Sequence, residues 1–284
     1  MNNWNFTEIP TPEEDDVLDI LMIGSSGCYY YVEELWGMLD AVGIKARVCN
    51  VYYSGCNLVQ HYNWWVGNQS NYQFYVTDEN GRGGTNNVSL EYCLAQGDWD
   101  VISLQESSAA KLRVGEAQTL LAERKVYLDA LYGYLGEQFP KADLYWHENG
   151  AYQKGYNQAF KIETVEQQAE DTRHFREFAK AIAAEYNVQW IPRGEASQIY
   201  REIPGIEDNL CARLAINNGE GDYYHDGDIG GGQYLTATVW FEMLTGQSII
   251  GNTWRPDYEL AEEKILLLQQ CGHLAVERLK NGEY

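Results

Sequence analysis

The chain has 284 residues, of which 45% are hydrophobic, which is enough to bury a sizeable core in one large domain or two smaller ones. Its 42 acidic and 20 basic residues give a formal net charge of −22, and no long basic run interrupts the acidic excess. We therefore expect neither nucleic acids nor anionic membranes as partners. No apolar stretch reaches the roughly 18 residues of a membrane helix, and the first residues lack the basic and apolar character of a signal peptide. We expect a soluble protein, either cytoplasmic or secreted with its leader trimmed.

The six cysteines include no C-x-x-C pair, so a zinc site built on that motif is not expected. The cysteine pattern leaves the redox compartment open. The chain is also rich in aromatic residues, with 22 tyrosines and 9 tryptophans, and such rings favour surfaces that stack on sugars or on other rings.

Apolar runs and helical periodicity alternate along the chain. The polar, acidic residues 1–15 are expected to form a surface arm. Residues 57–87 follow no regular period, but residues 72–76 and the Asn80-Gly81 turn predict a short hairpin within them. Residues 192–225 are also expected to be irregular. Strands are predicted at residues 17–23, 46–53, 100–104, 142–146 and 188–191, and helices at residues 32–42, 89–96, 117–139, 165–186, 233–245 and 260–279.

Five strands interleaved with helices favour a parallel sheet with helices on both faces. No internal repeat and no low-complexity linker divides the chain. The sequence therefore predicts one three-layer α/β domain over residues 1–284.

A tight turn, Gly24-Ser-Ser-Gly27, joins the first predicted strand to the helix that follows. A side chain at such a turn is exposed at the carboxyl end of a parallel strand, where open α/β sheets bind ligands. The adjacent helix N-terminus favours a developing anion. Ser26 is therefore a candidate nucleophile, with a capping role for the next helix as the structural alternative.

A serine nucleophile needs a base, and the chain has 5 histidines. His174 and His273 fall within predicted helices and are expected at the surface or in packing. His225 follows Asp222 by three residues, in a segment rich in Gly and Asp. On one turn both side chains can face the same way, so Asp222 can fix the tautomer of His225 and stabilise its imidazolium.

These features together resemble the SGNH (GDSL-type) hydrolases: Gly24-x-Ser26 near the amino terminus, an isolated Gly55 after the second strand and Asp222-x-x-His225 near the carboxyl terminus. Four segments are similar, more narrowly, to the DUF4886 subfamily of bacterial SGNH-like proteins. They are Ile23-Gly-Ser-Ser26, Tyr53-Ser-Gly-Cys-Asn-Leu58, Trp99-Asp-Val-Ile-Ser-Leu-Gln105-x-x-Ser108 and Gly232-Gln-Tyr-Leu235. The resemblance covers residues 17–246, and we expect residues 247–284 to form a C-terminal extension whose helix packs on the domain.

The resemblance implies a flavodoxin-like fold with a five-stranded parallel sheet, and an esterase triad of Ser26, His225 and Asp222. The oxyanion hole of the family carries over to the backbone N–H groups of Ser26 and Gly55, together with a side-chain donor from the third block. The proposed mechanism needs no metal and no organic cofactor, so neither is expected.

The chain departs from the family pattern at three places. Ser25 stands where an Asp or Asn usually precedes the serine, and Gly27 stands where a Leu or Phe usually follows it. The third block reads Gln105-Glu-Ser-Ser instead of Gly-x-Asn-Asp. Gln105 can donate from its amide and Ser107 from its hydroxyl, and the sequence leaves open which of them serves the oxyanion. The loss of one such donor typically lowers the rate by about 10²–10³-fold.

Two other ligands are alternatives at these motifs. The Gly24-Ser-Ser-Gly27 turn is also suited to a phosphate, although no Walker lysine and no G-x-G-x-x-G pattern accompanies it. The acidic segment that begins at Asp222 resembles a calcium loop. An EF-hand counted from Asp222 needs an Asp or Asn where Tyr224 stands and a Glu where Gln233 stands, so a metal is not expected there.

Aromatic and polar residues outside the motifs are candidates for contact with the substrate. His61, Trp64 and Trp65 follow the second block and are expected to stack on a sugar, with core packing as the alternative. His147 and Glu148 follow the fourth strand and are expected at the same sheet edge.

Cys28 and Cys56 follow Ser26 and Gly55 closely in the sequence. If the first two strands are neighbours, the two thiols lie near one another. A disulfide between them is an open alternative to two free thiols.

The sequence therefore predicts a serine esterase that hydrolyses a small acyl ester, preferably an acetyl group on a carbohydrate. The preference follows from the aromatic-rich loop, from the substrates that the resemblance implies and from the absence of an apolar lid helix. Two alternatives stay open. One is a non-catalytic glycan-binding module, and the other is a flavodoxin-like protein that binds a phosphate or nucleotide at the first turn.

Overall fold

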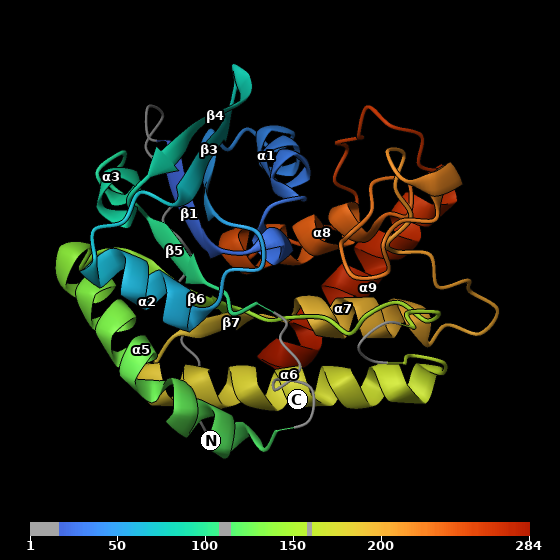
Figure 1. The fold of residues 1–284 in the computed structure, drawn as a ribbon. Coiled ribbons are helices and arrows are strands. Elements are labelled where there is room, and N and C mark those ends of the chain that lie inside the picture. Colours follow the sequence, from blue (N-terminus) through green and yellow to red (C-terminus); the bar gives the residue numbers. More distant parts are fainter. Residues whose placement is uncertain (1–16, 108–114, 158–160) are drawn as a thin grey trace.

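A seven-stranded sheet forms the middle layer of the protein, with the strand order β4-β3-β2-β1-β5-β6-β7. Helices cover both faces of the sheet, which gives an α/β/α arrangement (Figure 1). The computed structural model describes residues 17–107, 115–157 and 161–284. The expected surface arm at residues 1–15 lies outside these ranges.

Five strands run parallel and match the five strands predicted from the sequence to within one residue at each end. They are β1 (Leu18–Gly24), β2 (Ala46–Tyr52), β5 (Val101–Leu104), β6 (Asp143–His147) and β7 (Gln189–Ile191). β1 is almost wholly apolar because both of its faces are covered. Ile20 and Met22 lie in the core on one side of the sheet, and Leu21 and Ile23 lie in the core on the other.

The prediction of a purely parallel sheet of five strands is wrong in one respect, because the sheet is mixed and has seven. β3 (Tyr72–Asp78) and β4 (Gly81–Val88) form the expected hairpin, and this hairpin joins the sheet antiparallel to β2. Tyr72 and Phe74 alternate with more exposed residues along β3 and are buried in the same core as Val51 of β2. Because one face of β3 is apolar and packs on the core, the hairpin can pair with β2 and extend the sheet at its edge.

In the described part of the chain, four helices cover each face of the sheet. α1 (Val32–Asp40), α7 (Arg193–Arg201), α8 (Gly232–Thr245) and α9 (Glu262–Lys280) lie on one face. α2 (Leu58–Val66), α3 (Leu90–Leu94), α5 (Ala117–Gln138) and α6 (Val165–Tyr186) lie on the other. α9, the helix expected in the C-terminal extension, packs on α8 and α7. In the described ranges, no helix combines the length and the apolar composition that crossing a bilayer requires.

Two of these helices lie in segments that the sequence predicted to be irregular. α2 begins with a capping box, in which the side chains of Asn57 and Gln60 accept from each other's backbone N–H groups at 3.0 and 3.1 Å. This Asn-x-x-Gln spacing is visible in the sequence and indicates the start of a helix. α7 holds few apolar residues, and it is buried because Glu195 and Arg201 find charged partners in neighbouring elements.

A buried carboxyl group connects α1 to the chain beyond α8. Glu34 is 3% exposed, and its Oε1 accepts a hydrogen bond of 2.9 Å from the Tyr258 hydroxyl. One turn later, Gly37 leaves room for the indole of Trp254, with which a Cβ at this position would collide. Burial raises the pKa of Glu34 to about 8, so the folded protein keeps this carboxyl protonated in neutral solution.

The raised pKa makes the stability depend on pH. The pKa of Glu34 is about 4.5 in the unfolded chain and about 8 in the folded chain. The contribution of Glu34 to the free energy of unfolding is therefore complete below pH 4.5 and is lost as the pH rises to 8. We expect Glu34→Gln to remove this loss, so that the variant gains about 2–4 kcal/mol on the wild type between pH 5 and pH 8. Urea unfolding at a series of pH values measures the difference, and a difference that stays constant with pH would contradict the assignment.

Candidate active site

The expected nucleophile turn lies where β1 ends. Gly24 closes the strand, Ser25 is the N-cap of the short turn η1 (Ser26–Cys28), and Ser26 is its first residue. Ser25 is 4% exposed, and its Oγ accepts from the Gly27 N–H at 3.5 Å. Ser26 is partly exposed. The structure therefore separates the roles of the two serines, since Ser25 caps the turn and Ser26 reaches the surface.

The side chain of Gln105 lies directly beneath this turn. Gln105 follows β5, the neighbour of β1, and is 2% exposed. Its Oε1 accepts from both the backbone N–H and the hydroxyl of Ser25, at 3.0 Å each. A Cβ at Gly24 or Gly27 would collide with the Gln105 side chain, which explains why glycine stands at both ends of the turn.

A chain of buried amides continues from Gln105. Its Nε2 donates to Asn149 Oδ1 at 2.8 Å, and Asn149 Nδ2 donates to the Glu106 carbonyl at 2.9 Å. Asn149 follows β6, so the network joins the loops after three neighbouring strands. Asn149 was not among the predicted site residues, and its one signal in the sequence is its position just beyond a buried strand. Ser107, the other candidate side-chain donor, is partly exposed.

The expected acid–base pair lies in the loop before α8. His225 Nδ1 lies 2.5 Å from Asp222 Oδ2, and Asp222 Oδ1 accepts from the His225 backbone N–H at 2.9 Å. Between them, Tyr223 adopts a φ of 68°, in the left-handed region, and this lets the chain reverse within three residues. Burial alone would raise the pKa of Asp222, but the hydrogen bonds from His225 outweigh it, and the pKa is lowered. A carboxylate that stays ionised can orient the imidazole and stabilise its charged form.

Backbone contacts fix the position of this loop. Gly227 and Gly230 donate to the carbonyls of Leu210 and Ala212, at 2.9 Å each. A Cβ at either glycine would overlap the backbone of the 209–212 segment. The glycines near His225 therefore allow the backbone of this loop to lie directly against the backbone of residues 209–212.

An ion pair anchors the same loop to α7. Asp226, next to His225, pairs with Arg193, and the two side chains are 8% and 11% exposed. Asp228 instead accepts the backbone N–H groups of residues 214 and 229, at 2.9 and 2.7 Å. The carboxylates of Asp222, Asp226 and Asp228 thus have separate partners and do not converge as the ligands of a calcium loop would.

Tyr30 connects the acid–base loop to the nucleophile turn. Its ring centre lies 4.9 Å from that of His225, and it follows Ser26 by four residues. The Arg213 guanidinium carbon lies 4.3 Å from the same ring centre, and Arg213 Nη1 lies 3.5 Å from Asp222 Oδ2. Two segments that are about two hundred residues apart in the sequence therefore meet at one place.

The structure buries three residues that were expected to contact the substrate. His61, His147 and Glu148 are fully buried, which corrects that expectation. His61 Nδ1 lies 2.9 Å from the Tyr72 hydroxyl, and burial lowers the pKa of His61 to about 3. His147 packs nearly parallel to the rings of Tyr31 and Trp240, with ring centres 5.6 and 5.8 Å away, and Glu148 accepts the backbone N–H of Gly194 at 2.9 Å. All three side chains belong to the interior beside the site.

Trp64 and Trp65 on α2 have different neighbours. Trp64 packs edge-on against Tyr53, in the loop after β2, with ring centres 4.8 Å apart. Trp65 packs on Tyr134 of α5, with ring centres 4.5 Å apart. Trp64 therefore lies near the second block, as expected, whereas Trp65 belongs to the contact between two helices.

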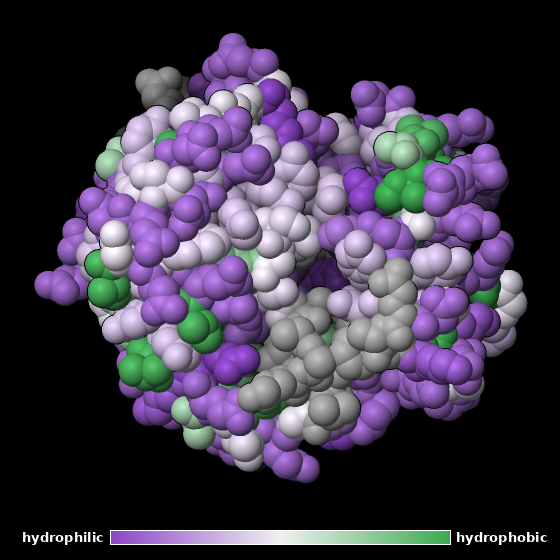
Figure 2. All heavy atoms as spheres, viewed as in Figure 1, coloured by the Kyte–Doolittle hydropathy of each residue, from purple (hydrophilic) through white to green (hydrophobic). Residues whose placement is uncertain are grey.

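A row of tyrosines that the sequence analysis did not single out flanks His225. Tyr30 and Tyr224 lie 4.9 and 4.3 Å from the imidazole, measured between ring centres. Beyond Tyr30 the row continues through Tyr29 to Tyr52, with ring centres 5.1 and 4.5 Å apart. Figure 2 shows a hollow in the middle of this face, between the part of the molecule that carries β1–β4 and the part that carries residues 205–231. The signal in the sequence was the run of three tyrosines directly after the serine turn.

The six cysteines are buried free thiols, so Cys28 and Cys56 form no disulfide. Burial raises the pKa of Cys28 to about 12, which keeps its thiol neutral. These cysteines act as small apolar side chains in the core.

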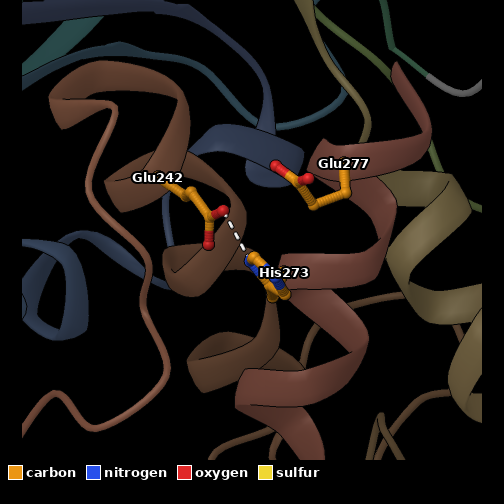
Figure 3. A group of neighbouring side chains, drawn as sticks. All are labelled: Glu242, His273 and Glu277. Atoms are coloured by element: carbon orange, nitrogen blue, oxygen red, sulfur yellow. Dashed lines mark hydrogen bonds and ion pairs between the residues drawn. The ribbon is translucent and has the colours of Figure 1, made fainter. Parts of the chain in front are cut away.

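One group in the described ranges has ligand-type atoms close enough to hold a metal ion, and it lies near the end of α8 far from His225. Glu242 of α8 faces His273 and Glu277 of α9, with the ligand atoms within 4.8 Å of one another (Figure 3). Glu242 is 1% exposed, its Oε1 lies 2.7 Å from His273 Nδ1, and its Oε2 accepts from the Ile249 N–H at 3.1 Å. These hydrogen bonds account for the buried carboxylate without an ion.

Comparisons with known proteins agree with this architecture. The model of the family described as "Domain of unknown function (DUF4886)" matches residues 19–269. The crystal structure of a DUF4886 family protein from Bacteroides uniformis is similar, with a TM-score of 0.80 and 25% identity over 93% of this chain and 96% of that chain. A proposed SGNH hydrolase from Slackia heliotrinireducens has a TM-score of 0.50 and 18% identity over 81% of this chain and all of its own. An acetylxylan esterase from Geobacillus stearothermophilus has a TM-score of 0.48 and 16% identity, over 85% and 97% of the two chains. A search of curated proteins found no match.

The fold and the arrangement of the loops define an α/β protein whose fold is similar to that of a proposed SGNH hydrolase, with a serine turn after the first strand and an Asp–His pair before a late helix. Within that class, the chain belongs to the DUF4886 family, whose model spans most of its length. The resemblance drawn from the sequence motifs is therefore confirmed.

The Arg193–Asp226 pair should be essential to the stability of the loop that carries His225. Arg193→Met leaves the buried Asp226 carboxylate without its cation, and we expect the free energy of unfolding to fall by about 3–5 kcal/mol. Arg213→Gln is the matched control, because its partner Asp222 is 18% exposed and the expected loss is about 1 kcal/mol or less. Urea unfolding of the two variants checks the difference, and equal losses would contradict the structural role of the buried pair.

The His273–Glu242 contact should stabilise the packing of α8 on α9. His273→Ala leaves Glu242 Oε1 without its partner at a site that is 1% exposed, and we expect a loss of about 1–3 kcal/mol in unfolding free energy. His273→Gln keeps a donor at this position and should lose less. A thermal or urea unfolding series separates the two variants, and a loss in the glutamine variant equal to that in the alanine variant would count against the hydrogen bond.

Proposed function

We propose that the protein is a serine esterase in which Ser26 is the nucleophile, His225 the general base and Asp222 the residue that orients the base. The observation that carries this proposal is the 2.5 Å contact between Asp222 and His225, with the ring of Tyr30, four residues beyond Ser26, packed against the imidazole. A carboxylate that holds Nδ1 leaves Nε2 available for the serine hydroxyl. The SGNH hydrolase fold of the chain supports the same class of reaction.

In the proposed reaction, His225 takes the hydroxyl proton of Ser26 as its Oγ attacks the ester carbonyl carbon. The tetrahedral intermediate collapses with cleavage of the bond to the alcohol oxygen, and His225 returns the proton to the leaving alcohol. Water then attacks the acyl-enzyme with His225 again as the base. This second step releases the carboxylic acid and restores the Ser26 hydroxyl.

The oxyanion is proposed to bind at the backbone N–H groups of Ser26 and Gly55. Gly55 has a φ of 66° and lies in an exposed turn after β2, so its N–H is accessible to a ligand. Gln105 and Ser107 are the proposed side-chain donors. The Nε2 of Gln105 carries two hydrogens, of which Asn149 accepts one, and it lies beneath Gly27, next to the nucleophile.

We infer that the substrate is a small acyl ester, preferably an acetyl ester, on a carbohydrate. The support comes from the tyrosines on both sides of His225, because sugar rings bind on aromatic side chains through their apolar faces. A non-catalytic glycan-binding module would use the same surface and is the second candidate. The phosphate-binding alternative is weaker, since the Ser25 N–H donates to Gln105 and the Gly27 N–H to Ser25 Oγ, which leaves fewer donors for an anion.

A fluorophosphonate probe tests the esterase proposal, because it labels serines that a base activates. We expect labelling at Ser26 and hydrolysis of 4-nitrophenyl acetate, and we expect Ser26→Ala to abolish labelling and to lower turnover by at least about 10³-fold. Ser89→Ala is the matched control, since Ser89 caps α3 and lies outside the site.

Intact-mass and peptide analysis of the labelled protein locate the modified residue. Absence of label, or label that persists in Ser26→Ala, would overturn the esterase proposal and leave the glycan-binding candidate.

A further inference from the structure

A patch of three tyrosines and one arginine lies beside the serine turn, and the proposed reaction does not use it. We name it the tyrosine–arginine patch, and it consists of Tyr29, Tyr52, Tyr75 and Arg82. The ring centre of Tyr29 lies 4.5 Å from that of Tyr52 and 5.1 Å from that of Tyr75. The Arg82 guanidinium carbon lies 4.0 Å from the Tyr29 ring centre and 5.3 Å from that of Tyr75. All four residues are partly exposed, so the patch is accessible from solvent.

The β3–β4 hairpin builds this patch and holds it against the serine turn. Tyr75 of β3 lies across Gly84 of β4, where a Cβ would collide with the ring. Arg82 Nη2 donates to the Tyr29 carbonyl at 3.0 Å, and the Tyr29 N–H donates to the Ser26 carbonyl at 3.3 Å. Two hydrogen bonds therefore connect the guanidinium to the residue proposed as the nucleophile.

Within residues 17–107, 115–157 and 161–284, Arg82 has no acidic partner. No carboxylate of the described ranges pairs with its guanidinium, although the chain contains 42 acidic residues. Its Nε is buried without an acceptor, and of its five N–H donors the Tyr29 carbonyl takes one. The hairpin therefore places an incompletely bonded cation next to the candidate active site.

A second guanidinium lies over the adjacent tyrosine. Arg213 stacks on Tyr30, and its ion pair with Asp222 is long, at 3.5 Å, because Asp222 already binds His225. Arg82 and Arg213 therefore lie over two tyrosines that follow Ser26 by three and four residues. Because no carboxylate of the described ranges pairs with Arg82, its positive charge attracts an anionic substrate toward this turn.

We propose that the tyrosine–arginine patch binds the carboxylate of an acidic sugar unit next to the scissile ester, so that the substrate class is an acylated uronic-acid glycan. The inference rests on the proposed function, which supplies the ester. A guanidinium binds a planar carboxylate through two parallel N–H···O bonds, and the neighbouring tyrosine rings offer faces on which the sugar stacks. A neutral glycan or a simple lipid ester would leave Arg82 unpaired.

Calorimetric titration of the Ser26→Ala protein, which cannot turn over an ester, tests this binding. The probes are trigalacturonic acid and a neutral galactose trisaccharide. We expect the acidic trisaccharide to bind at least about tenfold more tightly, because charge-assisted pairs of this kind contribute at least one factor of ten in affinity. The preference should shrink as sodium chloride rises from about 0.05 M to about 0.5 M, since salt screens the attraction.

Substitutions of Arg82 in the Ser26→Ala protein show whether the preference for the acidic trisaccharide depends on this residue. Arg82→Gln should remove the preference for the acidic trisaccharide, and Arg82→Lys, which keeps the charge but not the planar fork, should retain part of it. Arg278→Gln is the matched control, because Arg278 lies on α9 in a separate depression formed with α6 and α7. Thermal unfolding shows whether each variant is folded. If Arg82→Gln does not fold, the partial loss of preference expected for Arg82→Lys tests the inference in its place.

Equal affinity for the two trisaccharides, no binding of either, or an equal loss for both in Arg82→Gln would overturn the inference. The last outcome would show that Arg82 only attaches the hairpin to the turn. Failure of the proposed function looks different, because Ser26 would then escape the fluorophosphonate probe while Arg82-dependent binding of trigalacturonic acid persisted.

Discussion

The buried hydrogen bonds between the serine turn and Gln105 are the constraint on which the candidate site depends. The turn satisfies the N–H groups of Gly27, Cys28 and Tyr29 within itself, but the buried N–H of Ser25 needs a partner from elsewhere in the chain. Gln105, from the next strand, accepts from the N–H and hydroxyl of Ser25, and Asn149 holds the Gln105 amide in turn. A polar network of three loops thus holds the capping residue Ser25, and Ser26 is left partly exposed.

The second half of the site has no regular secondary structure and is held by other means. The loop with Asp222 and His225 lies on the backbone of the 209–212 segment, through glycines that permit close approach, and the Arg193–Asp226 pair attaches it to α7. Tyr30 then fills the space between the two halves. The arrangement of these two segments is therefore set by packing between residues that lie far apart in the sequence.

The features that could be predicted from the sequence are those that depend on short-range pattern. Continuous apolar runs indicate strands that are buried on both faces, and the spacing of Asp222 and His225 places both side chains on one turn. The Gly24-Ser-Ser-Gly27 turn is equally local. In contrast, the hairpin at residues 72–88 was expected, but whether it would extend the sheet depended on an edge of β2 that no local pattern describes.

The sequence by itself thus determined the five parallel strands, the longer helices, the serine turn and the Asp–His pair, because neighbouring residues fix their conformation. Only the tertiary structure decided which polar side chains are buried. His61, His147 and Glu148 follow helix starts or strand ends as the candidate site residues do, yet they are buried against Tyr72, Trp240 and Gly194, which lie in other elements. The same long-range packing brought His225 and Arg82 against the tyrosines that follow Ser26. Burial is a property of the whole fold, since the groups that exclude water from a side chain lie far from it in the sequence.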